Sequence, residues 1–261
     1  MLLFLYNYKK IIDMYLENII AQKNAAFYVS RVREVKMPSR ANSTDAGCDV
    51  YVPKVNAQFL EDLYILNHKN GTELYINLNC NIDGVIYTEQ VSFSTIGEWD
   101  KECEMNNTDR LSIMDTLFFN LLTVLYDNGI NIDDLPEDKV KMYYTFTLPA
   151  HSRVLIPGGI KVTIFPKQSC LTAANKSGVA TKKGLIYTCH IIDSFYTGEV
   201  GYGVVNTSNE DVTIEPETKL LQLLHLPVLL STPTEIDEDT YNKLTSNSDR
   251  GTGGFGSSGI N

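Results

Sequence analysis

The sequence of 261 residues has few cysteines and no long apolar run. Its five cysteines are an odd number without a CxxC pair, which argues against a disulfide scaffold and a cysteine-rich zinc site. They favour a reducing compartment, so we expect a cytoplasmic protein, in the host cytoplasm if the protein is viral. The apolar start at residues 1–6 is broken by Asn7, Lys9 and Lys10 and is too short to span a membrane. We therefore expect no membrane association.

The sequence also lacks low-complexity tracts and an excess of positive charge. Because 43% of its residues are hydrophobic, it can form a sizeable core, and collagen-like, coiled-coil and disordered classes are excluded. A net charge of −10 argues against nonspecific nucleic-acid binding, since a polyanion would be repelled. The excess lies in residues 54–149, with 16 acidic and 6 basic residues. Residues 151–190 contain six basic residues and no acidic one, which suits either a small polyanion or a solvated sheet surface.

Hydrophobic spacing predicts a helix followed by many short strands. Residues 8–22 carry apolar side chains at helical spacing, which predicts an N-terminal helix. The segments expected to be strands are FYVSRVREV, CDVYV, VLIP, GIKVTIFP, GVATKKGL, YTCHIID, YTGEVGYGVVN, VTIEP and LLQLLHLPV. Turn residues separate them at short intervals, which indicates an antiparallel sandwich or barrel.

The acidic segment between these strands has its own pattern. LYILN and ELYINL flank Asn70–Gly71, which predicts a hairpin. Apolar residues at three- and four-residue steps over 111–126, ending before Gly129, predict an amphipathic helix. We expect an inserted α+β module.

The chain ends in a polar stretch followed by RGTGGFGSSGIN. Gly251, Gly253 and Gly256 match GxGxxG, but too few residues follow to form the helix that a dinucleotide site requires. The glycines instead allow backbone amides to approach a phosphate closely, and Arg250 can bind phosphate oxygens. Phe255 can stack on a base, so this segment suits a flap over a bound nucleotide. Residues 231–249 are expected to be a mobile linker to this flap.

Five blocks occur in an order that resembles the trimeric dUTP pyrophosphatase (dUTPase) family. They are AGCDVY (46–51), KSGVA (176–180), HIIDSFYTGEV (190–200), LLQLL (220–224) and RGTGGFGSSG (250–259). The resemblance implies a mainly β, distorted jelly-roll barrel with three subunits sharing three active sites. It divides the chain into an N-terminal helix (1–26), a β core (27–56 and 144–230), an inserted acidic module (57–143) and a flexible C-terminal arm (231–261).

The resemblance also implies Mg²⁺-assisted hydrolysis of dUTP to dUMP and pyrophosphate. Asp193 would take the proton of the attacking water, and Tyr196 would lie under the deoxyribose. Asp49 would hold Mg²⁺ through water. The residues expected to bind the rest of the substrate are Lys176, Ser177, Gly178, Gln222, Arg250, Gly254, Phe255, Gly256, Ser257 and Ser258.

Three departures from the family pattern leave alternatives open, at Lys176, at His190 and in the inserted acidic module 57–143. Lys176 replaces a usual Arg, which keeps the charge but loses the bidentate geometry and predicts a tighter dependence on Mg²⁺. His190 replaces a usual Gly and resembles dCTP deaminases, although position 203, where a deaminase needs Glu, is Gly203. The alternatives are a pyrophosphatase for another deoxypyrimidine triphosphate, a dCTP deaminase-like enzyme, or a regulator that binds a protein partner through residues 57–143.

Overall fold

The computed structural model describes residues 25–248 and 251. The N-terminal helix expected over 8–22 lies outside this range. The chain divides into two compact units, one ending at Val228 and one beginning at Leu229. Among the described residues, no helix is long and apolar enough to cross a membrane.

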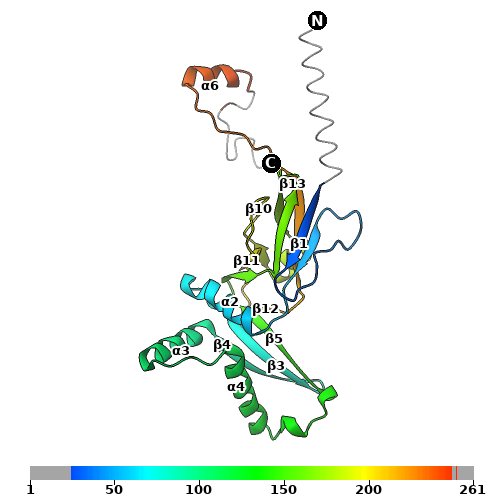
Figure 1. Cartoon of the computed structure of the whole chain (residues 1–261), viewed down its shortest axis with the longest axis vertical. Coiled ribbons are helices and arrows are strands. Elements are labelled where there is room, and N and C mark those ends of the chain that lie inside the picture. The colour runs from blue at the N-terminus through cyan, green and yellow to red at the C-terminus, as the bar shows by residue number, and fades with distance from the viewer. Residues whose placement is uncertain (1–24, 249–250, 252–261) are drawn as a thin grey trace. The chain divides into compact units, whose positions relative to one another are not determined.

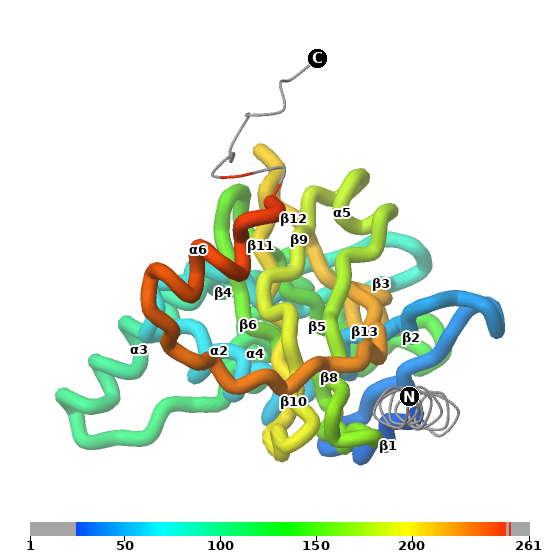
Figure 2. The backbone as a smooth tube through the Cα atoms, turned by 90° about the horizontal axis from the view of Figure 1, so that it is seen from above, coloured from blue at the N-terminus to red at the C-terminus, as the bar shows by residue number. Residues whose placement is uncertain are grey.

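Three antiparallel sheets form the β core of the first unit. One pairs β1 (Ala26–Arg31) with β7 (Ile160–Phe165), and one has the order β6 (Arg153–Pro157), β11 (Gly201–Asn206), β9 (Leu185–Tyr187). The third has the order β10 (Ile191–Asp193), β8 (Ser169–Asn175), β13 (Lys219–Pro227), β2 (Cys48–Tyr51). Figure 2 shows β8 between β10 and β13. The expected mainly β, jelly-roll-like fold is confirmed.

The segment between β2 and β6 contains helices and a fourth sheet. Its elements are α2 (Ala57–Asn67), η1 (His68–Asn70), β3 (Tyr75–Ile82), β4 (Val85–Ser92), α3 (Phe93–Asn106), α4 (Ile113–Asp127), η2 (Ile132–Asp134), η3 (Glu137–Lys139) and β5 (Val140–Leu148). The sheet has the order β12 (Val212–Ile214), β5, β3, β4. Helices α3 and α4 lie beside it (Figure 1). Because β12 comes from the core, this sheet joins the inserted segment to the barrel.

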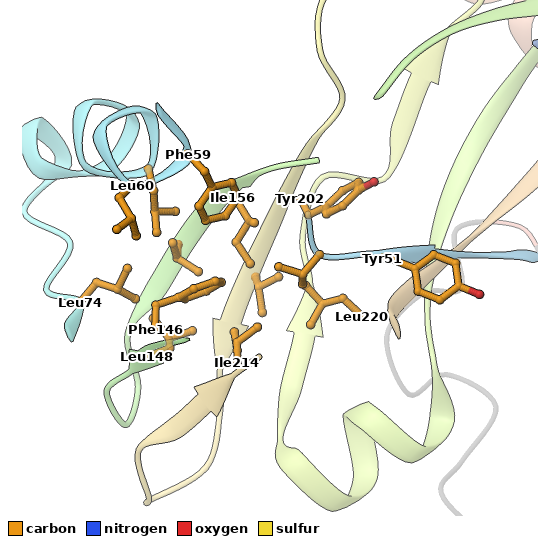
Figure 3. Close-up of a cluster of buried hydrophobic side chains, with 14 of the residues drawn as sticks. Tyr51, Phe59, Leu60, Leu74, Phe146, Leu148, Ile156, Tyr202, Ile214 and Leu220 are labelled. Carbon is orange, nitrogen blue, oxygen red and sulfur yellow. The ribbon is translucent and has the colours of Figure 1, made fainter. Parts of the chain in front are cut away.

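Side chains of the inserted segment and the barrel form one hydrophobic core. Phe59 and Leu60 of α2 share it with Phe146 of β5 and Ile156 of β6 (Figure 3). All four side chains are fully buried. Burying such side chains contributes about 1.5–3 kcal/mol each, so α2 is an integral part of the barrel's packing.

Two predicted elements were wrong. LYILN belongs to α2, and Asn70–Gly71 ends η1, with Gly71 in the left-handed region that favours glycine. The hairpin instead joins β3 to β4 through Asp83 and Gly84, both at positive φ, as a tight hairpin turn requires. GVATKKGL is not a strand, because α5 (Ser177–Lys183) occupies it and Gly184 ends that helix at positive φ.

The helix expected over 111–126 is confirmed as α4. Ser112 caps it by accepting a hydrogen bond from the backbone N–H of Asp115 at 3.1 Å, and Leu117, Leu121 and Leu125 form its buried stripe. The second unit contains α6 (Glu238–Thr245), which begins inside the stretch expected to be a linker. Asp237 caps α6 by accepting a hydrogen bond from the N–H of Thr240 at 2.7 Å. In so acidic a stretch, this capping aspartate does not stand out as the start of a helix.

Candidate active site

Asp193 and Tyr196 lie on the turn that follows β10. Asp193 is the last residue of this strand and pairs with Cys170 of β8. The N–H of Tyr196 donates to the carbonyl of Asp193 at 3.0 Å, and the Tyr196 hydroxyl donates to the carbonyl of Glu199 at 2.9 Å. A Cβ at Gly198 would stand 2.4 Å from that hydroxyl oxygen, so the close approach requires glycine. The turn therefore fixes the Tyr196 ring relative to the backbone of Asp193.

A pocket of about 390 Å³ lies beside this turn. Asp193, Tyr196 and Glu199 are among its lining residues. Its other lining residues are Leu66, Leu155, Pro157, Tyr187, Cys189, Ile191, Ile192, Val200 and Gly201. An apolar pocket with a few convergent polar groups is the usual form of a small-molecule site.

Lys167 is hydrogen-bonded to the same turn. Its ammonium donates to the carbonyl of Ser194 at 3.0 Å and lies 4.7 Å from the ring centroids of both Phe165 and Phe195. The Ser194 hydroxyl donates back to the carbonyl of Lys167 at 2.9 Å. This member of the basic segment thus supports the turn, and places a positive charge near Asp193's strand end.

A second cluster surrounds the carboxylate of Asp49, which is buried on β2. Lys176 donates to its Oδ1, and Lys219 donates to its Oδ2 at 3.1 Å. Burial alone would raise the pKa of Asp49, but the hydrogen bonds and charges of the two lysines outweigh it and lower the pKa. Asp49 is thus a buried anion held by two cations.

Gln222 completes this cluster. It pairs with Asp49 on β2 and with Ala174 on β8, and its amide donates to the carbonyl of Asn175 at 3.3 Å. A Cβ on Gly47 would stand 2.6 Å from the Gln222 Oε1, so the small residue in AGCDVY makes room for this amide. Ser177 and Gly178 follow directly at the exposed start of α5. The structure therefore brings Asp49, Lys176 and Gln222 together.

Within one chain, this cluster is separate from Asp193. Asp193 pairs with Cys170 near the beginning of β8, whereas Lys176 follows Asn175 at its end. Five residues of strand correspond to about 17 Å at about 3.3 Å per residue. The predicted catalytic carboxylate and the predicted phosphate-binding residues thus occupy opposite ends of one strand.

His190 and Gly203 bear on the choice of reaction. His190 is exposed, and its ring stands 5.9 Å from that of Tyr187, nearly perpendicular to it. A Cβ at Gly203 would stand 2.5 Å from the Cys189 Sγ and 2.8 Å from the Thr188 Oγ1. Both atoms belong to exposed side chains in the loop after β9, so a glutamate at position 203 would require the side chains of Thr188 and Cys189 to move.

The described residues contain no group of three or more His, Cys, Asp or Glu side chains that could hold a metal ion. Both oxygens of Asp49 accept from lysines. A carboxylate has about four acceptor positions, so Asp49 can still accept from a water molecule. The residues thus fit a metal ion bound through water and not one held directly by protein ligands.

The structure adds site residues that no sequence motif marks. Lys219 is the first residue of β13, three residues before Gln222, and it binds Asp49. Its closeness to the motif LLQLL is the sequence signal that could have identified it. Leu66 and Leu155 line the pocket from elements distant in sequence, and no local pattern marks them. Six predicted binding residues lie outside the described ranges, namely Arg250, Gly254, Phe255, Gly256, Ser257 and Ser258.

Comparison with known proteins identifies the class to which this barrel and its motifs belong. The dUTPase family model matches residues 139–259. The deoxyuridine 5'-triphosphate nucleotidohydrolase of Aeromonas salmonicida is 34% identical over 115 residues, which are 43% of this chain and 72% of that protein. The enzyme of the same name from Bdellovibrio bacteriovorus is 38% identical over 109 residues, 41% of this chain and 68% of that protein. The chain belongs to the dUTPase family.

A solved structure supports the same fold. A variant of the dUTPase of Staphylococcus bacteriophage 80alpha, solved with dUpNHpp, aligns with a TM-score of 0.50. The alignment covers 90% of this chain and 99% of that chain at 16% sequence identity. At this identity the likeness concerns the fold alone.

Proposed function

We propose that the protein hydrolyses dUTP to dUMP and pyrophosphate. The observation that carries the proposal is the pocket beside the β10 turn, which holds Asp193 and Tyr196 against an apolar wall. Membership of the dUTPase family supports the substrate, since relatives such as the Aeromonas enzyme are named for hydrolysis of deoxyuridine triphosphate. The free state of all five cysteines suits the cytoplasm, or a host's cytoplasm if the protein is viral.

In this proposal Asp193 is the general base. A water molecule attacks the α-phosphorus, its proton passes to the Asp193 carboxylate, and the bond from the α-phosphorus to the bridging oxygen breaks to release pyrophosphate. Tyr196 lies against the deoxyribose and leaves no space for a ribose 2′-hydroxyl. Its ring is fixed by Gly198 and by its hydrogen bond to the carbonyl of Glu199.

The triphosphate is bound by the cluster at the other end of β8. Lys176 supplies positive charge, Ser177 and Gly178 supply donors, and Gln222 supplies an amide. Because Asp193 and this cluster are far apart in one chain, the proposal places them in one site across an interface of a homotrimer. The C-terminal arm closes the site with Arg250, Gly254, Phe255, Gly256, Ser257 and Ser258.

Mg²⁺ is proposed as the cofactor. When bound, it neutralises negative charge on the triphosphate. Asp49 would hold the ion through water, which suits an ion that gives up water reluctantly. Since Lys176 already donates to Asp49, substrate binding requires the ammonium to divide its donors between this carboxylate and a phosphate. This division is a physical reason for the stronger dependence on Mg²⁺ expected from the sequence.

The packing at Gly203 favours hydrolysis over dCTP deamination. A deaminase-like reaction would need a glutamate at position 203, where this chain has Gly203 packed against the side chains of Cys189 and Thr188. Hydrolysis of another deoxypyrimidine triphosphate stays an alternative, because His190 stands where the family has a glycine near the pyrimidine ring of the substrate. A role as a regulator that binds a protein partner through residues 57–143 also stays a prediction. The exposed side chains of Phe119 and Tyr126 on α4 are its support.

A hydrolysis panel tests the proposal. The full chain is assayed with dUTP, dCTP, dTTP and UTP, with and without Mg²⁺, by release of pyrophosphate and of ammonia. We expect pyrophosphate from dUTP in the presence of Mg²⁺, little from UTP, and no ammonia. Ammonia from dCTP, or equal turnover of dCTP and dUTP, would contradict the proposed substrate.

The variant Asp193→Asn tests the proposed base. It keeps the shape of the side chain and removes its basicity. We therefore expect kcat to fall by about 10²–10⁴-fold, while the affinity for dUpNHpp, measured by calorimetry, stays within about twofold of wild type. Normal turnover by this variant would exclude Asp193 as the base.

A further inference from the structure

Helix α2 of the inserted segment is fixed to an edge of the β core. The side-chain amide of Asn67, its last residue, donates to the carbonyl of Leu155 at 2.9 Å and accepts from the N–H of Leu155 at 2.8 Å. Leu155 belongs to β6, which is one of the two outer strands of the sheet β6-β11-β9. Asn67 is buried. Its amide supplies the hydrogen bonds that a neighbouring strand would otherwise make with this edge strand.

A second contact joins α2 to the turn that carries Tyr196. Arg33 donates to both oxygens of Glu199, at 2.7 and 3.0 Å, and to Asp62 of α2 at 2.5 Å. Glu199 also accepts from the N–H of Gly159 at 2.8 Å. The Arg33 side chain is only 14% exposed, so these charge-assisted hydrogen bonds are partly shielded from water. The guanidinium of Arg33 therefore links α2 to the turn that carries Tyr196.

These two attachments place Leu66 in the wall of the pocket. Leu66 immediately precedes Asn67 and lines the pocket together with Leu155, Asp193 and Tyr196. Its side chain is 40% exposed, so apolar surface remains uncovered in the chain. Among the pocket residues, it is the one that the inserted segment contributes.

We propose that Leu66 is a substrate-contacting residue, through which the inserted segment forms part of the nucleotide site. The inference rests on the proposed function. The apolar wall of Leu66, Leu155 and Pro157 matches the chemistry of a pyrimidine deoxynucleoside, which has carbon-bound hydrogens on one ring edge and on the sugar. Bound nucleotide covers the exposed part of Leu66, and this burial stabilises the complex.

The variant Leu66→Ala tests this inference, with Ile65→Ala as the matched control. Ile65 is the preceding residue of α2, is 58% exposed and does not line the pocket. Binding of dUpNHpp is measured by calorimetry on the full chain, together with KM and kcat for dUTP. For Leu66→Ala we expect Kd and KM to rise about 5- to 10-fold with kcat within twofold, since the contact exists in both ground and transition states. Ile65→Ala should match wild type.

The outcomes separate the inference from the function on which it rests. Wild-type protein that neither binds dUpNHpp nor cleaves dUTP refutes the proposed function. If wild type binds and cleaves normally, unchanged affinity in Leu66→Ala overturns the role of Leu66. Equal losses in Leu66→Ala and Ile65→Ala also overturn it, because they indicate a general effect on α2. Leu66→Asp gives a second test, since a carboxylate in this wall repels a nucleotide anion and should weaken binding more than alanine does.

Discussion

The buried carboxylate of Asp49 is stabilised by two lysines that come from different parts of the chain. Lys176 follows β8 and Lys219 begins β13, so the ion pairs connect three strands of one sheet. Breaking them leaves partly buried charges without partners, which costs more than an exposed ion pair contributes. The same carboxylate therefore serves both the stability of the sheet and, in the proposed reaction, the phosphate end of the site.

This arrangement predicts a particular dependence of stability on pH. The pKa of Asp49 is lower in the folded protein than the unfolded value of about 3.9. Its contribution is thus fully present above about pH 4 and is lost as the pH falls through the folded pKa. Asp49→Asn should lower the free energy of unfolding by about 1–2 kcal/mol at pH 6, and the gap should shrink below pH 4. Urea denaturation at several pH values measures this, and parallel curves from pH 6 to pH 3 would contradict it.

The glycine at position 198 is predicted to control the position of Tyr196. In Gly198→Ala the new Cβ would overlap the Tyr196 hydroxyl, so the ring must move and lose its hydrogen bond to Glu199. We expect KM for dUTP to rise about tenfold, the size of effect typical of a misfitted pocket contact. Gly97→Ala in α3 is the control, because its Cβ would make an ordinary contact of 3.5 Å with the Tyr64 hydroxyl. Steady-state kinetics that are equal in both variants would refute the positioning of Tyr196.

At the level of single residues, the sequence was informative where chemistry follows a local motif. Through their resemblance to dUTPase motifs, AGCDVY, KSGVA and LLQLL predicted Asp49, Lys176 and Gln222 for one site, and strand pairing with the Lys176–Asp49 ion pair brings them together. Residues such as Leu66 and Arg33 could not be predicted in this way. Their contacts join positions far apart in sequence, for example Arg33 with Glu199, and no spacing rule encodes such a pair.

Among the elements, the inserted segment shows why turn signals can mislead. Asn70–Gly71 has the composition of a hairpin turn, but the preceding residues carry Phe59, Leu60 and Leu63 at helical spacing and bury them in the core. Helical burial outweighed the turn signal, and Gly71 ends the helical region instead. The hairpin at Asp83–Gly84 has the same turn chemistry, with both residues at positive φ. Helix α4 was predictable because its apolar stripe is long and a glycine follows it.

The contact between α2 and the β core is predicted to matter for stability. Arg33→Ala leaves the carboxylates of Asp62 and Glu199 without their common partner in a partly buried place. We expect the free energy of unfolding to fall by about 2 kcal/mol. Lys139→Ala removes an exposed ion pair with Asp83 at 3.2 Å and serves as control, with an unchanged denaturation midpoint. Equal denaturation midpoints for Arg33→Ala and wild type would show that the ion pairs of Arg33 contribute nothing to stability.

For the whole molecule, the separation along β8 limits what a single chain can do. The pocket with Asp193 and the cluster around Asp49 lie at opposite ends of this strand. Closed threefold symmetry would bring one end of a chain next to the other end of its neighbour. The sequence predicted three shared sites by resemblance, and the one-chain geometry supplies a physical reason for sharing.

Mixed trimers test this central claim most directly. Chains with Asp193→Asn and chains with Lys176→Gln and Gln222→Ala are co-expressed with different affinity tags, and trimers that carry both tags are assayed with dUTP. Each variant alone should be at least about 100-fold impaired. In a mixed trimer, one of the three interfaces pairs an intact Asp193 with an intact phosphate cluster, so we predict about one third of wild-type activity. Mixed trimers no more active than the two variants alone would contradict the shared site and place each reaction within a single chain.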